Sequence, residues 1–237
     1  MKKYIPFCFL FTLFGVACKK SGNSTVSTTP NFYLATVQRI ENTDTENYRI
    51  MYNAQNQVDT IIQPYGLLAF TYSANSYNVL KVGVDSDGYT VGYTVKLNAS
   101  GNITDINDSH NELSVAYDSK GRISAESEYS GGYYSNTIYD WVNGDIDSSS
   151  QDNLFVGRFT YYYDIAHTWQ PGDLFGIEDF LQYGRPVVRS THLLTQTRSA
   201  SGVNTYKYTF DSKSRIAQTT GTGNFGSVMY KYTYTAN

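Results

Sequence analysis

Three histidines are the first candidates for catalysis or metal binding, and their spacing supports neither role. His110, His167 and His192 are far apart, and none is part of a helical ligand pair such as HExxH. The sequence also contains no GxSxG motif and no phosphate-binding loop. It therefore predicts no catalytic residue, no metal site and no cofactor.

Two acidic stretches could be considered for calcium, because carboxylate oxygens are its preferred ligands. VDSDGYTV places Asp85 and Asp87 as in the opening of a calcium loop, but the third acidic position and the closing glutamate are missing. A hairpin turn is the better interpretation. NGDIDSSSQD contains Asp145, Asp147 and Asp152, and we interpret it as a solvated acidic loop.

Aromatic residues offer a different kind of chemistry, since exposed rings can stack on sugars or hold apolar ligands. Most of the 23 tyrosines alternate with Thr and Lys, so they should form the apolar face of a sheet. Trp141 and Trp169 fall in stretches that we expect to be loops or irregular segments. Together with His167 they are the candidate ligand contacts.

The composition excludes two classes of protein. Aromatic residues make up 16% of the 237-residue chain, which is too many for a chain kept disordered by its charge. The 18 basic residues face 21 acidic ones, so nucleic-acid binding through a strongly basic surface is also excluded.

The first 17 residues have the order of a secretory signal peptide: Lys2 and Lys3, an apolar run at 4–14, and small residues up to Ala17. The following GVAC resembles the lipobox of bacterial lipoproteins, in which the cysteine carries the lipid. Cys8 lies in the segment that would be removed, so Cys18 is the only thiol of the mature chain. We expect Cys18 to be lipidated and to attach the protein to a membrane.

The polar stretch that follows divides the chain into three parts. Residues 1–17 are the signal peptide, residues 18–30 the lipidated cysteine with a flexible tether, and residues 31–237 a single antiparallel β domain. Lys19 and Lys20 follow the cysteine directly. In lipoproteins of the Bacteroidetes type, acidic residues at this place direct export to the outer surface. Their absence predicts an outer-membrane location facing the periplasm.

From residue 31 onward, apolar and polar residues alternate with period two, as in half-buried antiparallel strands. In YTVGYTVKL, for example, Tyr93, Val95 and Leu97 share one face. Most strands look shorter than the 9 to 11 residues of a membrane-spanning strand. The expected fold is all-β: an antiparallel meander that closes into a soluble barrel or a strongly curved sheet with a filled interior.

Four hairpin turns follow one template. YNAQNQV, LNASGNI, YDSKGRI and FDSKSRI each begin with an aromatic or aliphatic residue and Asp or Asn, and each ends in Ile or Val. This order predicts a type I turn followed by a left-handed residue, supplied by Asn56, Gly101 and Gly121. Ser214 departs from the template, so that turn has another geometry or a mild strain.

These features together resemble a known family. YDSKGRI is similar to the unit of YD-repeat proteins, but the irregular spacing of the four copies indicates a local hairpin device. The lipobox, the tether, the turns and the aromatic strands FTYYYD, YKYTF and YKYTYT look like a Bacteroidetes lipoprotein family of unknown function with a porin-like β fold. The resemblance implies the fold and brings no activity or catalytic residues.

One stretch, residues 164–186, interrupts the strands. Asp173 is a good N-cap, apolar residues follow at i, i+3 and i+7 from Leu174, and Gly184 is a stop signal. This predicts one short amphipathic helix. We expect it to cover the core at an open end or edge of the sheet, and as an alternative to form one wall of a ligand site.

The expected function is that of a non-catalytic binding or scaffolding module of the cell envelope, with a glycan or an envelope protein as its partner. Two alternatives remain open. The first is a hydrolase acting on glycan or lipid, which would need paired carboxylates from distant strands. The adjacent Glu178 and Asp179 cannot form a general acid/base pair alone, because their side chains diverge by about 100° on a helix. A carrier would need an empty apolar interior.

Overall fold

The computed structural model describes residues 32–83, 90–108, 111–152, 154–166, 174–185, 190, 192–223 and 226–236. Phe32–Asn237 form one compact unit. Cys18, His110, His167 and Trp169 lie outside the described residues, so the expectations placed on them are not tested by the structure.

The described chain contains 16 strands and one helix. In chain order they are β1 (Phe32–Glu41), β2 (Asp44–Tyr52), β3 (Val58–Gln63), β4 (Gly66–Tyr72), β5 (Ser76–Gly83), β6 (Thr90–Leu97), β7 (Ile103–Asn107), β8 (Asn111–Tyr117), β9 (Ile123–Ser130), β10 (Tyr133–Val142), β11 (Asp145–Gln151), β12 (Leu154–Ala166), α1 (Leu174–Tyr183), β13 (His192–Ser199), β14 (Gly202–Phe210), β15 (Ile216–Gly223) and β16 (Gly226–Ala236).

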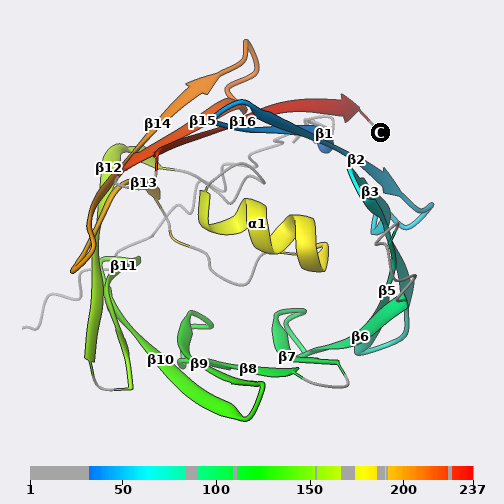
Figure 1. Cartoon of the computed structure of the whole chain (residues 1–237), viewed down its shortest axis with the longest axis horizontal. Helices are drawn as coiled ribbons and strands as arrows, with labels where there is room; N and C mark the ends of the chain where they lie inside the picture. Colours follow the sequence, from blue (N-terminus) through cyan, green and yellow to red (C-terminus); the bar gives the residue numbers. More distant parts are fainter. Residues whose placement is uncertain are drawn as a thin grey trace, which may run out of the picture. The chain divides into compact units, whose positions relative to one another are not determined.

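The strands form one closed antiparallel barrel in which each strand pairs with its neighbours in sequence, and β1 closes the ring by pairing with β16 (Figure 1). This confirms the predicted barrel. At one end of the closing pair Phe32 is opposite Ala236, and at the other end Glu41 is opposite Val228. We call these two ends of the barrel the near mouth and the far mouth.

Alternation along each strand separates an apolar interior from a polar exterior. On β16, Val228, Tyr230 and Tyr232 face inward as predicted, whereas Lys231 and Thr233 between and beside them are exposed. The buried core draws on most of the barrel and on α1; among its least exposed members are Leu34, Ile61, Tyr77, Val95, Ile103, Ile123, Ile146, Ile177, Leu193 and Ile216.

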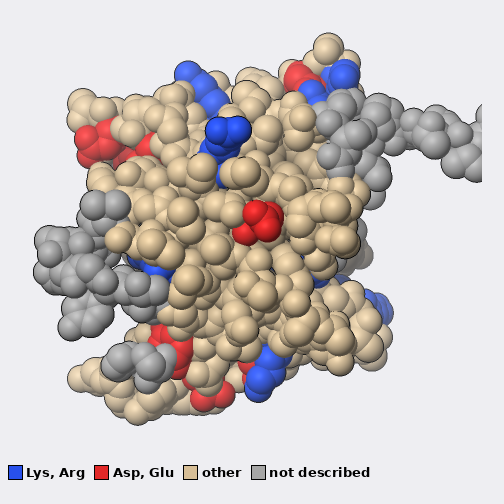
Figure 2. Space-filling model, turned by 90° about the vertical axis from the view of Figure 1, so that its right-hand side faces the viewer, with Lys and Arg blue, Asp and Glu red and all other residues tan. Residues whose placement is uncertain are grey.

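The outer face of the barrel exposes apolar side chains such as Ile62, Leu80 and Val82, together with hydroxyl and amide groups that bond in pairs across neighbouring strands. These pairs include Gln38 with Asn47 at 3.1 Å, Thr94 with Asn78 at 2.8 Å, Thr205 with Thr222 at 2.8 Å and Thr36 with Thr233 at 2.7 Å. Figure 2 shows one side of the barrel, where single charged side chains are scattered over a largely uncharged surface.

All four template turns have the same backbone. In each copy, the carbonyl of the first Asn or Asp accepts a hydrogen bond from the N–H three residues on at 2.9 to 3.0 Å. Its side-chain Oδ1 accepts from the N–H groups two and four residues on at 2.8 to 3.0 Å. The left-handed residues are Asn56 (φ 61°), Gly101 (77°), Gly121 (75°) and Ser214 (59°). The predicted geometry is therefore confirmed, and Ser214 adopts it at the cost of strain rather than forming another turn.

A bulge accompanies each of these turns, because the register of the flanking strands shifts by one residue directly beside it. The carbonyl of the first strand residue after the turn then accepts a hydrogen bond from an aromatic side chain on the next strand. These bonds are Tyr72 to Val58 (2.8 Å), Tyr117 to Ile103 (2.7 Å), Trp141 to Ile123 (2.5 Å) and Tyr234 to Ile216 (2.8 Å).

Two expectations about irregular segments are wrong. NGDIDSSSQD is the strand β11 rather than an acidic loop, because Asn143 (φ 53°) and Gly144 (φ 92°) form a two-residue hairpin turn and Ile146 is buried in the core. Trp141 lies on β10 and not in a loop.

The predicted helix is confirmed as α1, and it lies inside the ring of strands (Figure 1). It ends as expected at Gly184, whose φ is 69° and whose N–H donates to the Phe180 carbonyl at 2.8 Å.

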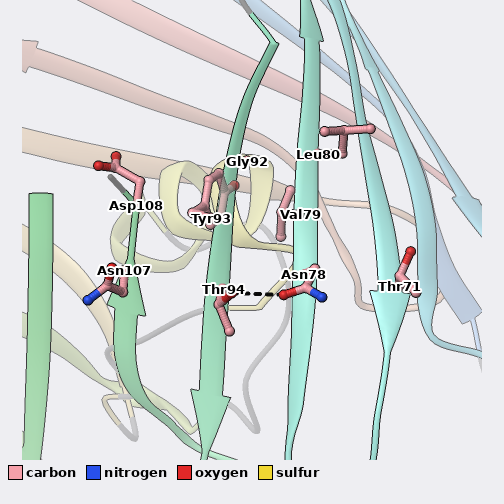
Figure 3. A pocket seen from close by; sticks show the side chains of 9 residues that line it. All are labelled: Thr71, Asn78, Val79, Leu80, Gly92, Tyr93, Thr94, Asn107 and Asp108. Carbon is pink, nitrogen blue, oxygen red and sulfur yellow. Dashed lines mark hydrogen bonds between the residues drawn. The ribbon is translucent and has the colours of Figure 1, made fainter. Parts of the chain in front are cut away.

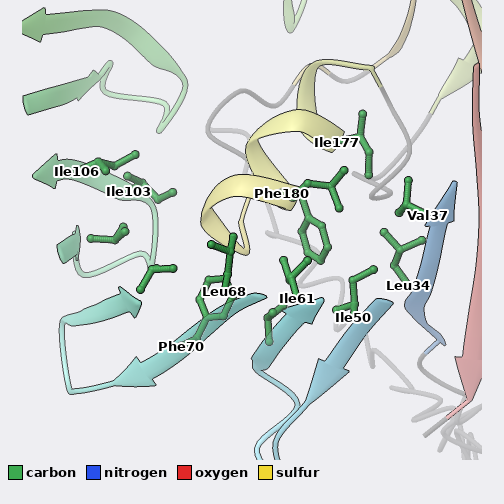
Figure 4. Packing of buried hydrophobic residues seen from close by; sticks show 14 of the residues in the cluster. Leu34, Val37, Ile50, Ile61, Leu68, Phe70, Ile103, Ile106, Ile177 and Phe180 are labelled. Carbon is green, nitrogen blue, oxygen red and sulfur yellow. The ribbon is translucent and has the colours of Figure 1, made fainter. Parts of the chain in front are cut away.

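The helix packs on the core through its apolar face. Ile177 and Phe180 pack against the wall formed by the early strands (Figure 4). The helix therefore packs on the core as expected, and of the two expected places a sheet edge is excluded, because β1 pairs with β16. No helix in the described ranges is long and apolar enough to cross a bilayer.

The wall of the barrel supplies hydrogen-bond donors to the end of α1. The last carbonyls of a helix have no partner within it. The Tyr77 hydroxyl donates to the Tyr183 carbonyl at 2.7 Å, the Tyr93 hydroxyl donates to the Gln182 carbonyl, and the Gln63 amide donates to the Leu181 carbonyl at 3.4 Å. β3, β5 and β6 thus hold the helix C-terminus in place.

The turn geometry generates a pair of substitutions with opposite effects. Gly121→Val should lower the free energy of unfolding by about 1 to 2 kcal/mol, because a β-branched residue is strained at positive φ. An added Cβ would meet nothing within 4 Å there, so the backbone alone sets the cost. Ser214→Gly should raise the free energy of unfolding by up to about 1 kcal/mol. Urea unfolding measures both, and shifts of the same sign would contradict the common geometry.

The helix anchors generate a second prediction. Tyr77→Phe keeps the ring in the core but leaves the Tyr183 carbonyl without its donor, so it should cost about 1 to 3 kcal/mol. Tyr134→Phe is the control, because Tyr134 is 67% exposed on the outer wall. Hydrogen exchange should accelerate at the Gly184 amide in the first variant only. Equal behaviour of the two variants would show that the barrel does not anchor the helix.

Candidate functional site

A charged network inside the barrel joins α1 to the wall. Arg39 on β1 donates to Glu46 at 3.2 Å and to the Tyr230 hydroxyl at 3.2 Å, and it also pairs with Glu41. Its Nε lies 3.6 Å from Glu178 on the helix, and Tyr230 donates its hydroxyl to the same carboxylate. Burial raises the pKa of Tyr230, and the adjacent Glu178 raises it further, so this hydroxyl keeps its proton and remains a donor.

A second polar group lies on β9 and β10. The Tyr139 hydroxyl donates to Glu126 at 2.5 Å. Burial raises the pKa of Glu126, the charge of Glu128 raises it further, and the hydrogen bond from Tyr139 lowers it. Burial and the charge of Asp179 raise the pKa of Tyr183 on the helix to about 12. Glu126 and Glu128 are therefore close enough for their charges to interact, and they are the carboxylates to consider for the hydrolase alternative.

A buried carboxylate and a histidine form a third pair. Asp145, only 2% exposed, accepts hydrogen bonds from the backbone N–H of His192 at 2.9 Å and has its Oδ2 2.7 Å from the ring Nδ1 of His192. The nearby Ser190 donates its hydroxyl to Tyr161 at 3.2 Å. The pair fastens the start of β13 to the β10–β11 hairpin. Within the described residues, no group of three or more His, Cys, Asp or Glu side chains could hold a metal ion.

Of the three predicted ligand contacts, the structure describes Trp141. Its ring lies under the Arg122 guanidinium, 5.1 Å from the ring centre, and its indole N–H is bonded to the Ile123 carbonyl. Trp141 therefore takes the place that tyrosine has beside the other template turns. His167 and Trp169 remain predictions.

One hollow of about 360 Å³ lies on the outer wall over β4 to β7 (Figure 3). A cross-strand row of Thr71, Asn78, Thr94 and Asn107 crosses it, with Gly92 beside the row. Its polar groups partly satisfy one another, as the bond from Thr94 to Asn78 shows. It is an open groove without an enclosed apolar surface.

A second hollow of about 200 Å³ lies at the far mouth, on the inner wall. The register places Glu41, Val228, Gly221 and Tyr206 in one row across β1, β16, β15 and β14. The row lies two residues beyond Arg39 along β1, so Glu41 connects the hollow to the charged network. We call it the far-mouth hollow.

Two glycines of β15 lie in the wall of the far-mouth hollow. A Cβ added to Gly221 would lie 3.2 Å from the Tyr206 ring and 3.3 Å from Val228, and one added to Gly223 would lie 1.7 Å from Asn204 Oδ1. Tyr206, Val228 and Asn204 therefore fill the space over these two residues, and only glycine allows them to lie so close to the backbone of β15. Val228 and Tyr206 line the hollow together with polar atoms of Glu41 and Asn204. Such a combination of an apolar surface with a few polar groups is typical of a small-molecule site.

Sequence reasoning missed this hollow because none of its residues belongs to a known motif. The available signal was the spacing of Gly221 and Gly223, which places both on one face of a strand. Its meaning depends on Tyr206, which becomes their neighbour only through the pairing of β14 with β15.

Solved structures with a similar fold come from Bacteroides. A porin-like protein from Bacteroides uniformis ATCC 8492 matches with a TM-score of 0.64 and 15% identity over 86% of this chain and 98% of that chain. A porin-like protein from Bacteroides vulgatus ATCC 8482 matches with a TM-score of 0.57 and 12% identity over 86% and 99% of the two chains. No protein-family model and no curated protein matches the sequence. The barrel with an internal helix therefore has a porin-like fold, as the sequence resemblance implied.

Proposed function

We propose that the protein is a non-catalytic binding module of the cell envelope whose ligand occupies the far-mouth hollow. The observation that carries this proposal is the hollow itself, about 200 Å³ in an inner wall that is packed elsewhere by core residues and α1. Its lining combines the apolar Val228 with the carboxylate of Glu41 and the amide of Asn204, and such a combination suits a small ligand.

We further propose that the protein is a lipoprotein, with residues 1–17 as its signal peptide and Cys18 as the lipidated residue. The outer membrane, facing the periplasm, is the proposed location. The order of residues around GVAC supports the anchor, and the porin-like neighbours support an association with the envelope.

The outer wall of the barrel supports attachment by lipid rather than by the barrel itself. A transmembrane barrel presents an apolar band to the lipid and keeps its polar residues inside. Here the outer face carries bonded pairs such as Thr94 with Asn78 and Thr205 with Thr222, whereas Ile and Tyr side chains fill the interior. Exposed apolar side chains such as Ile62, Leu80 and Val82 lie among these polar groups.

The anchor is tested by Cys18→Ser. The wild-type protein should partition into the detergent phase, because its N-terminal lipid is the proposed membrane attachment, and the variant should partition into the aqueous phase. Phase separation followed by mass spectrometry of the N-terminus measures both. Retention of the variant with membranes, processed at the same bond, would contradict the lipoprotein assignment.

A hydrolase is the second candidate, and Glu126 is the observation in its favour. Glu126 is a partly buried carboxyl with a raised pKa beside a second carboxylate, Glu128, and a general acid in a glycosidase needs such an environment. The bond from Tyr139 occupies this carboxyl in the structure, which favours a structural role. A carrier for a large apolar ligand is disfavoured, because Ile177 and Phe180 occupy the interior against the wall.

The binding function is tested by mapping chemical shifts during titration with small-molecule envelope extracts and a glycan panel. Shifts should appear at Glu41, Asn204, Tyr206 and Val228. Shifts confined to the outer groove or to the near mouth would contradict the proposed site. Turnover of a glycan or ester that Glu126→Gln abolishes would contradict the non-catalytic function. The same map tests the prediction that His167 and Trp169 contact the ligand.

A further inference from the structure

We propose that the outer groove, the hollow of about 360 Å³ over β4 to β7, binds a short stretch of an uncharged glycan that lies across the strands. This inference goes beyond the proposed function, because it concerns a second site on the outer face of the barrel wall. It follows from a strand glycine that the fold does not require, an exposed row of hydroxyl and amide groups, and the low charge of the lining.

Gly92 is the residue that keeps the groove open. It is exposed on β6, and glycine inside a strand weakens the strand. A Cβ added there would lie 3.7 Å from the Val79 carbonyl oxygen and 3.8 Å from Leu80, and both are ordinary contacts. At Gly221, by contrast, a Cβ would lie 3.2 Å from the Tyr206 ring. Neither packing nor a positive φ requires glycine at position 92, whereas a ligand that approaches the sheet closely does.

A row of hydroxyl and amide side chains crosses the groove beside this glycine. The register places the members of the row opposite one another on β4, β5, β6 and β7: Thr71, Asn78, Thr94 and Asn107 (Figure 3). Adjacent strands lie about 4.8 Å apart, so three steps between them give the row a length of about 14 Å. Successive rings of a glycan that lies across the strands can therefore bond to successive side chains.

The row offers both donors and acceptors. Thr94 Oγ1 donates to Asn78 Oδ1 at 2.8 Å, so the Asn78 amide N–H groups and the Thr94 oxygen face the groove as donors and acceptor. Thr71 and Asn107, at the ends of the row, are exposed and make no side-chain hydrogen bond to another described residue. Sugar hydroxyl groups both donate and accept, and the exposed Leu80 offers an apolar contact to the C–H face of a ring.

The lining and the closed barrel disfavour two other kinds of extended ligand. The described lining residues include no Lys or Arg, and Asp108 is their only charged member, so an acidic or phosphate-rich chain would find no countercharge. An extended peptide usually adds a strand to an exposed sheet edge. Because β1 pairs with β16, the barrel offers no such edge, and a peptide would have to bind without backbone pairing.

The inference is tested with the full-length protein in dodecylphosphocholine micelles and three uncharged trisaccharides: cellotriose, maltotriose and triacetylchitotriose. At least one of them should shift the NMR amide signals of Asn78, Gly92, Thr94 and Asn107 at millimolar concentrations. Trigalacturonate and an extended peptide of alternating Thr and Val should bind at least about tenfold more weakly. Silence of all three trisaccharides, or equal binding of the acidic sugar or the peptide, would overturn the inference.

A glycine variant localises the effect. Gly92→Val fills the groove without disturbing the fold, because the neighbours at 3.7 and 3.8 Å leave room for its Cβ and β-branched residues favour strands. It should weaken trisaccharide binding by about tenfold or more, while the urea midpoint stays the same or rises. Ala125→Val is the matched control on β9, outside the groove, and binding should be unchanged.

A second variant tests the polar row, and it remains informative if Gly92→Val fails to fold. Thr94→Val removes the hydroxyl that bonds to Asn78 and should weaken trisaccharide binding by about fivefold or more. Thr205→Val is its control, because it removes a hydroxyl from the similar pair with Thr222 on β14 and β15. Unchanged binding in both groove variants would overturn the inference.

The outcomes separate this inference from the proposed function. If the trisaccharides shift only the residues of the outer groove, and Gly92→Val abolishes these shifts, this inference stands and the far-mouth assignment is wrong. If they shift only Tyr206 and Val228, the far-mouth assignment stands and the outer groove is not a glycan site.

Discussion

A helix that ends inside a barrel must find donors for its last carbonyl groups, because a buried carbonyl without a partner is costly. Tyrosine hydroxyls from the wall meet this need at the end of α1, where Tyr77 and Tyr93 are the donors. The same residue type also donates to the carbonyls beside the bulged turns, as Tyr117 does to Ile103. Because a tyrosine buries its ring while its hydroxyl reaches a carbonyl, a chain with 23 tyrosines can pack its interior and satisfy its backbone with the same side chains.

The width of the barrel makes the helix necessary. A closed barrel of about 16 strands encloses more space than side chains alone can fill, and in porins that space is a channel. In this protein Ile177 and Phe180 bring apolar groups from α1 to the middle of that space and complete the core. Alternation along the strands then places Thr, Asn and Gln on the outside. The interior is therefore packed rather than open, although the strand order is the closed meander of a porin-like barrel.

Local features were predictable from the sequence, and contacts between distant segments were not. The turn at Gly121 and the end of α1 at Gly184 follow from backbone preferences within a few residues. For Ser214 the sequence left two alternatives, another turn geometry or a mild strain. The hydrogen bonds to Asp211 select the strained turn, and they are known only from the structure. The pairing of Asp145 with His192 joins residues 47 positions apart, which no spacing rule anticipates. Trp141 was wrongly expected in a loop. Its partner, the Ile123 carbonyl, lies beside another hairpin turn, and this contact is also not visible in the sequence.

The far-mouth hollow could not be predicted from chemically active residues in the sequence. In its wall, Tyr206 and Asn204 lie close against Gly221 and Gly223, and such a close approach has no sequence motif. The hollow becomes visible only when the register of three strand pairs brings Tyr206, Val228 and Glu41 into one row. That register depends on the bulge beside the β14–β15 turn, where Phe210 pairs with Ile216, since a slip of one residue would turn both glycines to the outer face. The strained turn at Ser214 therefore sets the geometry of a site at the opposite end of the same hairpin.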